Sequence, residues 1–127
     1  MAAASQRFSK RARLRKRPEF VKVQDGGAKL SADCLLALYL ANGRRQTRLG
    51  LTVSSKVGPA VVRNRVRRRL RELFRANQEK LPRGIDLVLI ARPTAARADF
   101  AALSRAFAKV TQELRRRLAD LPEKAAT

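Results

Sequence analysis

The side chains best suited to chemistry in this chain are arginines gathered between residues 63 and 75. This segment holds seven arginines and a single acid, Glu72. On a helix, Asn64, Arg67 and Arg71 share one face with neighbouring arginines, beside an apolar arc about 120° wide. Arginine pairs with phosphate through a planar fork and also stacks on bases. Asn64 adds both a donor and an acceptor for a base edge, a 2′-hydroxyl or a neighbouring carbonyl. The segment therefore predicts contact with nucleic acid.

Two other interpretations of this segment are weaker. A solvated helix face usually mixes charge signs so that residues four apart can pair, and this face does not. A membrane-surface helix needs a free apolar face. Here the flanking strands need that face to complete a core, so nucleic-acid contact is the favoured hypothesis.

Hydrolytic and metal chemistry lack suitable residues. The chain contains no histidine, which argues against a Ser-His-Asp triad and the usual zinc sites. Its single cysteine, Cys34, cannot form an intrachain disulfide, which indicates a reducing cytoplasm. Cys34 lies in an apolar run and is predicted to be a small core residue. The ten acidic residues are scattered, so the sequence predicts no two-metal site in the protein.

The overall charge points to a polyanionic partner. In 127 residues, 30 Lys and Arg against 10 Asp and Glu give a net charge of +20, which is typical of nucleic-acid-binding proteins. The longest apolar run, residues 34–41, has eight residues, against roughly 20 needed to span a bilayer. The basic N-terminus lacks the apolar core of a secretory signal. It also resembles an organellar transit peptide, but it runs directly into sequence that looks folded.

Turn and capping signals divide the chain into elements. After a basic leader over residues 5–17, Pro18 predicts a helix start, and a short helix runs to about Gln24. Residues 34–40 predict a buried strand, and Asn42-Gly43 predicts a hairpin to a second strand over 49–53. A strand over 29–31 is only weakly signalled.

The second half alternates helix and strand. Gly58-Pro59 begins the arginine-rich helix, and residues 85–90 form the clearest strand in the chain. Asp99 is predicted to cap the last helix. Its apolar stripe comprises Phe100, Leu103, Phe107, Val110, Leu114, Leu118 and Leu121. The order of elements predicts one α+β domain with helices packed on a small sheet.

A family resemblance rests on the region between these elements. The segment Leu49-Gly50-Leu51-Thr52-Val53-Ser54-Ser55-Lys56-Val57-Gly58, followed by Ala60-Val61-Val62-Arg63-Asn64-Arg65-Val66-Arg67-Arg68, closely resembles the signature of the bacterial ribonuclease P protein subunit. The resemblance extends over roughly residues 8–118. It implies an α/β sandwich like domain 2 of ribosomal protein S5, with a four-stranded sheet, three helices and a left-handed β-α-β crossover. General rules alone would favour a right-handed connection.

The resemblance also implies a function. Such a subunit assists a catalytic RNA in the endonucleolytic removal of the 5′ leader from precursor tRNA and is itself not catalytic. It binds no cofactor alone, and the Mg²⁺ of the cytoplasmic holoenzyme is held mainly by RNA. Expected partners are the catalytic RNA and the leader, not DNA or a membrane. The residues that match the catalytic-RNA site are Arg63, Asn64, Arg65, Arg67, Arg68 and Arg71, and those assigned to the leader site are Arg13, Arg17, Phe20, Tyr39 and Lys56.

The expected boundaries are a flexible basic arm over 1–16, one domain over 17–121 and a flexible tail over 122–127. The chain departs from the family at Gln24, where a second aromatic is common, and at Ser55-Lys56, where two basic residues are common. Ala37 matches the strand tyrosine of some relatives better than Tyr39 does. For Phe20, core burial and stacking on a leader base both remain open.

Three rival functions share part of this pattern. A ribosomal or RNA-chaperone protein would carry similar charge but show no preference for leader-bearing tRNA. An autonomous metal-dependent nuclease would need the acids to converge. A helix-turn-helix DNA-binding module is disfavoured because strands flank the arginine-rich helix on both sides.

Overall fold

The computed structural model describes residues 12–14 and 16–119, and in this part of the chain three α-helices accompany a four-stranded sheet. The sheet order is β1-β2-β4-β3; β4 is antiparallel to β2 and parallel to β3. In chain order the elements are α2 (Arg17–Gly26), β1 (Ala28–Ala32), β2 (Leu35–Ala41), β3 (Arg48–Thr52), α3 (Ala60–Asn77), the 3₁₀ turn η2 (Gln78–Lys80), β4 (Ile85–Ala91), the 3₁₀ turn η3 (Pro93–Ala96) and α4 (Phe100–Arg117).

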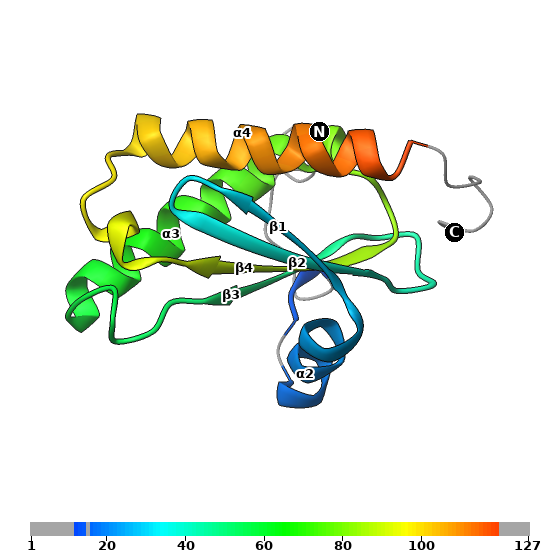
Figure 1. Cartoon of the computed structure of the whole chain (residues 1–127), viewed down its shortest axis with the longest axis horizontal. Helices are drawn as coiled ribbons and strands as arrows, with labels where there is room; N and C mark the ends of the chain where they lie inside the picture. Colours follow the sequence, from blue (N-terminus) through cyan, green and yellow to red (C-terminus); the bar gives the residue numbers. More distant parts are fainter. Residues whose placement is uncertain (1–11, 15, 120–127) are drawn as a thin grey trace.

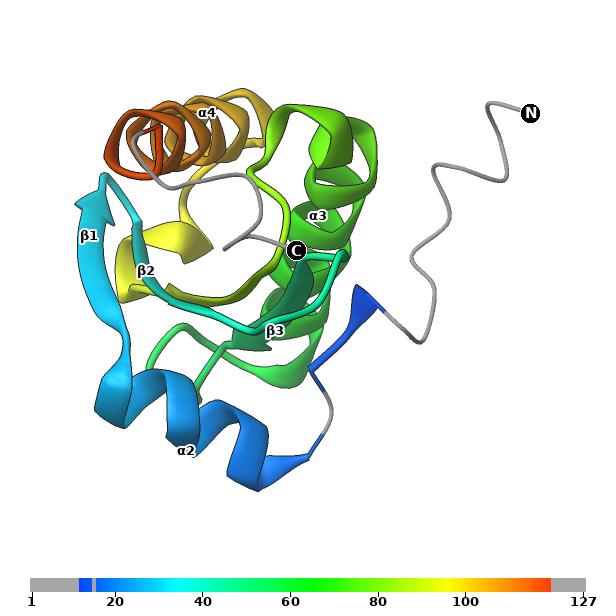
Figure 2. The ribbon, with the colours of Figure 1, turned by 90° about the vertical axis from the view of Figure 1, so that its right-hand side faces the viewer.

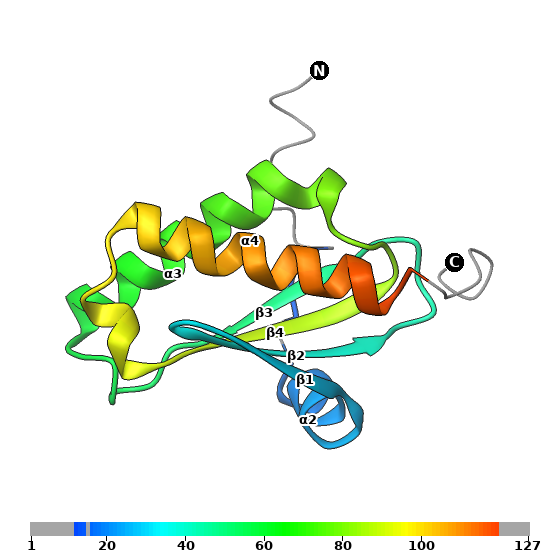
Figure 3. The ribbon, with the colours of Figure 1, turned by 45° about the horizontal axis from the view of Figure 1, so that its top comes forward.

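The helices lie in two layers, one on each face of the sheet. Helices α3 and α4 cover one face and α2 covers the other (Figure 1; Figure 2). In Figure 3, α3 and α4 lie toward the viewer and the parallel strands run to the left. In that view β4 lies below β3, and the chain reaches it from β3 by way of α3 in front of the sheet. With the strands running to the left, this makes the β3-α3-β4 crossover left-handed. The predicted α+β sandwich is confirmed, including this uncommon connection.

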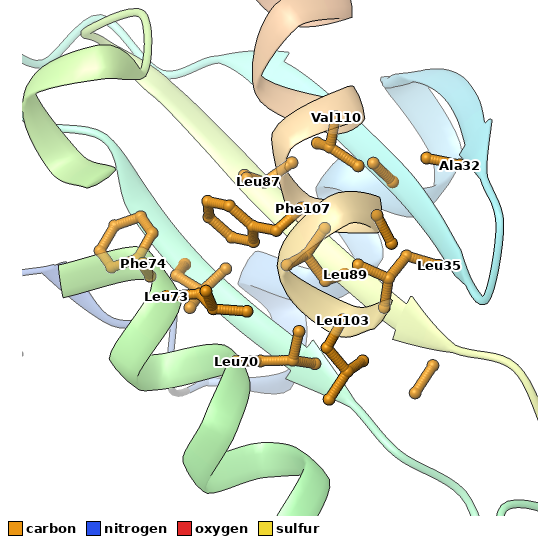
Figure 4. Packing of buried hydrophobic residues seen from close by; sticks show 14 of the residues in the cluster. Ala32, Leu35, Leu70, Leu73, Phe74, Leu87, Leu89, Leu103, Phe107 and Val110 are labelled. Carbon is orange, nitrogen blue, oxygen red and sulfur yellow. The ribbon is translucent and has the colours of Figure 1, made fainter. Parts of the chain in front are cut away.

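Alternation along the strands builds two separate cores. On β4, Leu87 and Leu89 face α3 and α4, whereas Val88 faces α2. In the larger core, Phe74 and Phe107 pack with leucines of the sheet and of both helices (Figure 4). The smaller core under α2 comprises Leu14, Val23, Leu38 and Val88, with Phe20, Leu40 and Ile90 at its margin. A sheet covered on both faces explains the nearly continuous apolar runs of β2 and β4.

The hairpin predicted at Asn42-Gly43 is wrong. Strand β4 lies between β2 and β3, so the chain passes over the end of β4 in a wide loop instead of a tight turn. Gly43 does adopt a positive φ of 68°. However, the Asn42 side-chain amide donates to the Gln46 carbonyl (3.1 Å) and to Asp86 Oδ1 (2.8 Å), which ties the loop to itself and to β4. Because every β4 residue except Ile90 is buried, this strand takes the central position with a partner on each side.

Most element boundaries agree with expectation. The weakly signalled strand is a full strand, β1, which pairs with β2 from Ala28 to Ala32. Asp99 caps α4 by accepting a hydrogen bond from the Ala102 N–H (2.8 Å). Of the predicted α4 stripe, Phe100 is 44 % exposed instead of buried, because it lies in the first turn beyond the sheet contact. Leu121 lies outside the described residues.

The expected boundary between arm and domain at residue 17 is too late. Ala12 and Leu14 are already buried. The Leu14 N–H donates to the Leu49 carbonyl (2.9 Å), and Arg13 forms an isolated parallel bridge with Leu49. An edge strand with unpaired backbone groups attracts such pairing. The remainder of the predicted arm, together with the predicted tail, lies outside the described residues. In the part of the chain that is described, no helix has the length and apolar content to cross a membrane.

Candidate nucleic-acid interface

The arginine-rich face belongs to α3, which begins after Pro59 and lies on the sheet through Val66, Leu70, Leu73 and Phe74. Burying these residues turns the opposite side of the helix to solvent, where Asn64, Arg68 and Arg71 are exposed. No acidic side chain forms an ion pair with an α3 arginine among the described residues. The helix therefore presents positive charge that the rest of the described chain leaves uncompensated.

Two of the arginines turn instead toward the segment that precedes α4. Arg65 Nη2 donates to the Ala96 carbonyl (3.1 Å), and Arg69 Nη1 donates to the Ala98 carbonyl (3.5 Å). These residues are one turn apart, so they face the same neighbour. Arg65, which the sequence assigns to RNA, thus has one amino group occupied within the protein and joins α3 to the start of α4.

Other contacts position the exposed face. Arg67 Nη1 donates to Asn64 Oδ1 (3.3 Å) and its Nη2 donates to the Val53 carbonyl (3.3 Å). Arg63 Nε donates to the Gly58 carbonyl (3.1 Å). These bonds hold long side chains in defined orientations, so less side-chain entropy is lost when a ligand binds.

Arg13, which the sequence assigned to the leader site, lies near the arginines of α3. The pKa of Arg71 is lowered by partial desolvation of its otherwise exposed side chain and by the positive charges of Arg13 and Arg67. The segment of Arg13 runs along the edge of β3 between α3 and α2 (Figure 2). We call Arg13, Arg67 and Arg71 the arginine cluster. Three neighbouring cations repel one another, so a phosphate group placed among them would relieve this repulsion.

A second surface lies on the opposite face of the sheet. A hollow of about 440 Å³ is lined by Arg17, Phe20, Val21, Gln24 and Thr52. We call it the α2 hollow. It combines one cation with an aromatic ring and polar side chains, the types that bind single-stranded nucleic acid. The sequence assigned Arg17 and Phe20 to one site, and the structure brings both to this hollow.

Phe20 is half-buried, so its ring contributes to the smaller core and also borders the α2 hollow. Gly50 makes this position possible. A Cβ atom at Gly50 would lie 2.6 Å from Phe20 Cε1 and 3.1 Å from Leu14 Cβ. The glycine of the predicted signature is therefore needed for close packing of the ring on β3.

The sequence prediction missed the ionic network that fastens α2 to the sheet. Arg48 forms two bonds with Asp86, Nε to Oδ1 (2.8 Å) and Nη2 to Oδ2 (2.7 Å), and its Nη1 donates to Glu19 Oε2 (2.7 Å). Asp86 is 6 % exposed. The bond to Asp86 raises the pKa of Arg48 further. An isolated acid within an otherwise apolar strand was the available signal, since a buried carboxylate needs a partner.

The other two residues predicted for the leader site, Tyr39 and Lys56, lie outside the α2 hollow. Tyr39 faces α4, on the other side of the sheet from Phe20, and Arg117 Nη1 donates to its hydroxyl (3.2 Å). Successive β2 residues point to opposite faces, so Leu38 and Leu40 face α2 instead. Ala37 shares the face of Tyr39. Lys56 is exposed in the turn between β3 and α3.

The structure also shows where the single cysteine and the acidic side chains lie. Cys34 is buried in the larger core, and burial raises the pKa of its thiol. Such a thiol is protonated and unreactive at neutral pH. Among the described residues, no three His, Cys, Asp or Glu side chains form a group that could hold a metal ion.

Comparison with known proteins gives one consistent result. A sequence model described as Ribonuclease P matches residues 8–115. The ribonuclease P protein component of Citrifermentans bemidjiense is 41 % identical over 115 residues, covering 91 % of this chain and 98 % of that protein. The ribonuclease P protein of Thermotoga maritima superposes with a TM-score of 0.74 at 32 % identity, covering 80 % of this chain and 96 % of that one. The Staphylococcus aureus protein gives a TM-score of 0.76 at 25 % identity, covering 80 % and 94 %.

Proposed function

The chain belongs to the ribonuclease P protein family, the subunits that assist a catalytic RNA in removing the 5′ leader of precursor tRNA, and we propose that it uses one surface for each RNA. In this proposal, α3 and the arginine cluster bind the catalytic RNA, and the α2 hollow binds the leader. The observation that carries the proposal is an arginine-rich helix face that has no acidic ion-pair partner in the described part of the chain and is separated by the sheet from an aromatic hollow.

The contact with the catalytic RNA is built mainly from phosphate interactions. Asn64 and Arg68 are exposed, and Arg67 and Arg71 lie on the same side of α3 beside Arg13. Phosphate contacts fix the position of a protein on folded RNA without reading its sequence. Arg65 contributes in a different way, by holding α3 against the segment that precedes α4.

The contact with the leader needs an unpaired strand. The Phe20 ring can stack on a base, while Arg17 neutralises a backbone phosphate at the same hollow. Lys56 lies four residues beyond Thr52 of the hollow and extends the positive charge toward the start of α3. Stacking is tolerant of sequence because every base has a flat face, which suits leaders of varied sequence.

Within the described residues, no side chains form a group that fits a catalytic metal site. We propose that the Mg²⁺ ions of the holoenzyme are held mainly by the RNA, and that the complex acts in the cytoplasm. The buried, unpaired Cys34 supports a reducing compartment. The role of the protein is then to screen phosphate repulsion and to add affinity for the leader.

The test is cleavage of a 5′-labelled precursor tRNA in low magnesium by the protein, by its catalytic RNA, and by both together. We expect efficient cleavage at the mature 5′ end only from the combination. Cleavage by the protein alone would refute a non-catalytic role. Binding of RNA without any stimulation of cleavage would favour a ribosomal or chaperone protein instead.

A pair of variants separates the two surfaces. R71A should weaken binding of the catalytic RNA, with little loss of protein stability, because Arg71 is exposed and lies beside two other cations. The matched control is R105A, which removes one charge from the exposed face of α4. F20L should lower the preference for precursor over mature tRNA and leave affinity for the catalytic RNA unchanged. Equal effects of R71A and R105A would contradict a specific α3 surface.

A further inference from the structure

A second hollow lies at the end of the molecule opposite the start of α3. The wide loop after β2 and the segment after α3 meet there, at the right-hand end of Figure 1. The hollow has a volume of about 280 Å³. Phe74 and Leu81, which are almost fully buried, lie at its apolar floor, and along α3 Phe74 lies about 16 Å from Arg63. We call it the end hollow. It is separate from the α2 hollow, which has none of its lining residues.

The walls of the end hollow are fixed to each other. Thr47 Oγ1 donates to the Pro82 carbonyl (2.5 Å) and accepts a hydrogen bond from the Ile85 N–H (3.3 Å). The Leu81 N–H donates to the carbonyls of Asn77 and Gln78 (3.3 Å each). The Thr47 bonds join the loop after β2 to the segment that leads into β4, and the Leu81 bonds hold the turn that follows α3. The hollow is therefore preorganised, which reduces the ordering cost of binding.

The rim carries polar groups that the protein does not use. Arg45, Arg83 and Glu79 are exposed, and Gln46 and Gln78 add two side-chain amides. Within the described part of the chain, these five side chains make no hydrogen bond or ion pair. Glu79 is the only acid of the lining against two arginines, so the rim favours an anion. Amides of this kind can pair with the edge of a base.

We infer that the end hollow binds one unpaired nucleotide of RNA, with its base above the apolar floor and its phosphate between Arg45 and Arg83. This inference rests on the proposed function, because it adds a third RNA contact to the two surfaces above. The hollow lies close to the lower limit of about 300 Å³ for small-molecule sites, which suits a single planar base. Two arginines around an apolar floor match a nucleotide, which is both anionic and aromatic.

The absence of tryptophan from the chain allows a direct test. The variant Q78W places a single tryptophan at the end hollow, and Q112W places one on the exposed face of α4 as the control; both are excited selectively over the one tyrosine. Each full-length variant is titrated with a five-residue oligouridylate, with catalytic RNA, and with catalytic RNA plus precursor or mature tRNA. Stacking of a base on the indole should quench the emission of Q78W much more than that of Q112W. If Q78W does not fold, Q46W replaces it.

The titration also identifies the source of the nucleotide. Quenching by catalytic RNA alone assigns the nucleotide to that RNA, and further quenching only by the leader-bearing precursor assigns it to the leader. Equal quenching of Q78W and Q112W under all conditions would overturn the inference.

A charge-matched pair of double variants provides the second measurement. R45A/R83A removes two cations from the rim, and R97A/R105A removes two exposed cations elsewhere. We expect R45A/R83A to lose about ten-fold or more in affinity for the RNA that quenches Q78W, as for lost charged hydrogen bonds, and the control to lose less. Equal losses would show general electrostatics only and would overturn the site. Precursor cleavage by the wild-type holoenzyme tests the proposed function separately.

Discussion

Replacing Arg48 by methionine should weaken the attachment of α2 to the sheet and show how much the ionic network contributes to the free energy of unfolding. Arg48 and Asp86 keep only 12 % and 8 % of their side-chain surface exposed, and two hydrogen bonds join them. The R48M variant leaves the Asp86 carboxylate buried with the Asn42 amide as its remaining side-chain partner. Removing one member of a buried ion pair lowers the free energy of unfolding by about 3–5 kcal/mol. Because both side chains keep some exposed surface, we expect a loss at the lower end of this range. We therefore expect a loss of about 3 kcal/mol, or about 12 °C in Tm.

Urea unfolding followed by circular dichroism measures this loss, with an unchanged m-value showing that the transition remains comparable. The control is K109M, which breaks an ion pair whose side chains are 59 % and 49 % exposed; it should cost less than about 1 kcal/mol. The double variant R48M/D86L should recover much of the loss, because no unpaired charge stays buried. A loss for R48M no larger than that for K109M would refute the reasoning. Because α2 carries Phe20, R48M should also lower the preference for precursor tRNA.

Further substitutions test single contacts. G50A would place a Cβ 2.6 Å from a Phe20 ring carbon; it should cost about 1–3 kcal/mol in urea unfolding and reduce leader discrimination, and unchanged discrimination would argue against the α2 hollow. D99A removes the cap of α4 and should cost about 1 kcal/mol by the same assay. The pKa of Glu113 is lowered to about 2, chiefly by the hydrogen bond from Arg116. The stabilisation from the Glu113–Arg116 contact is thus complete above pH 4.5, the ordinary pKa of the carboxyl group, and is lost as the pH falls toward 2. An NMR titration of Glu113 with a midpoint near 4.5 would contradict this.

The sequence by itself determined the elements and the nature of the partner. Pro59 and Asp99 mark the starts of α3 and α4 because their preferences are local. The apolar spacing of α3 fixed which side packs, and hence that Asn64 and Arg68 face solvent. Net charge and the excess of arginine predicted a polyanionic partner. The signature from Leu49 to Arg68 resembled one family, and that family is confirmed.

Tertiary structure alone decided which elements are neighbours. Asn42-Gly43 has the local chemistry of a tight turn, yet β4, more than forty residues later, inserts between the strands it connects. The same insertion brings Asp86 to Arg48 and so secures α2, a pairing that no local pattern specifies. Period-two alternation placed Tyr39 on the face of α4, away from Phe20. Strand order and register depend on long-range burial, because a strand that is apolar on both faces is most stable at the centre of the sheet.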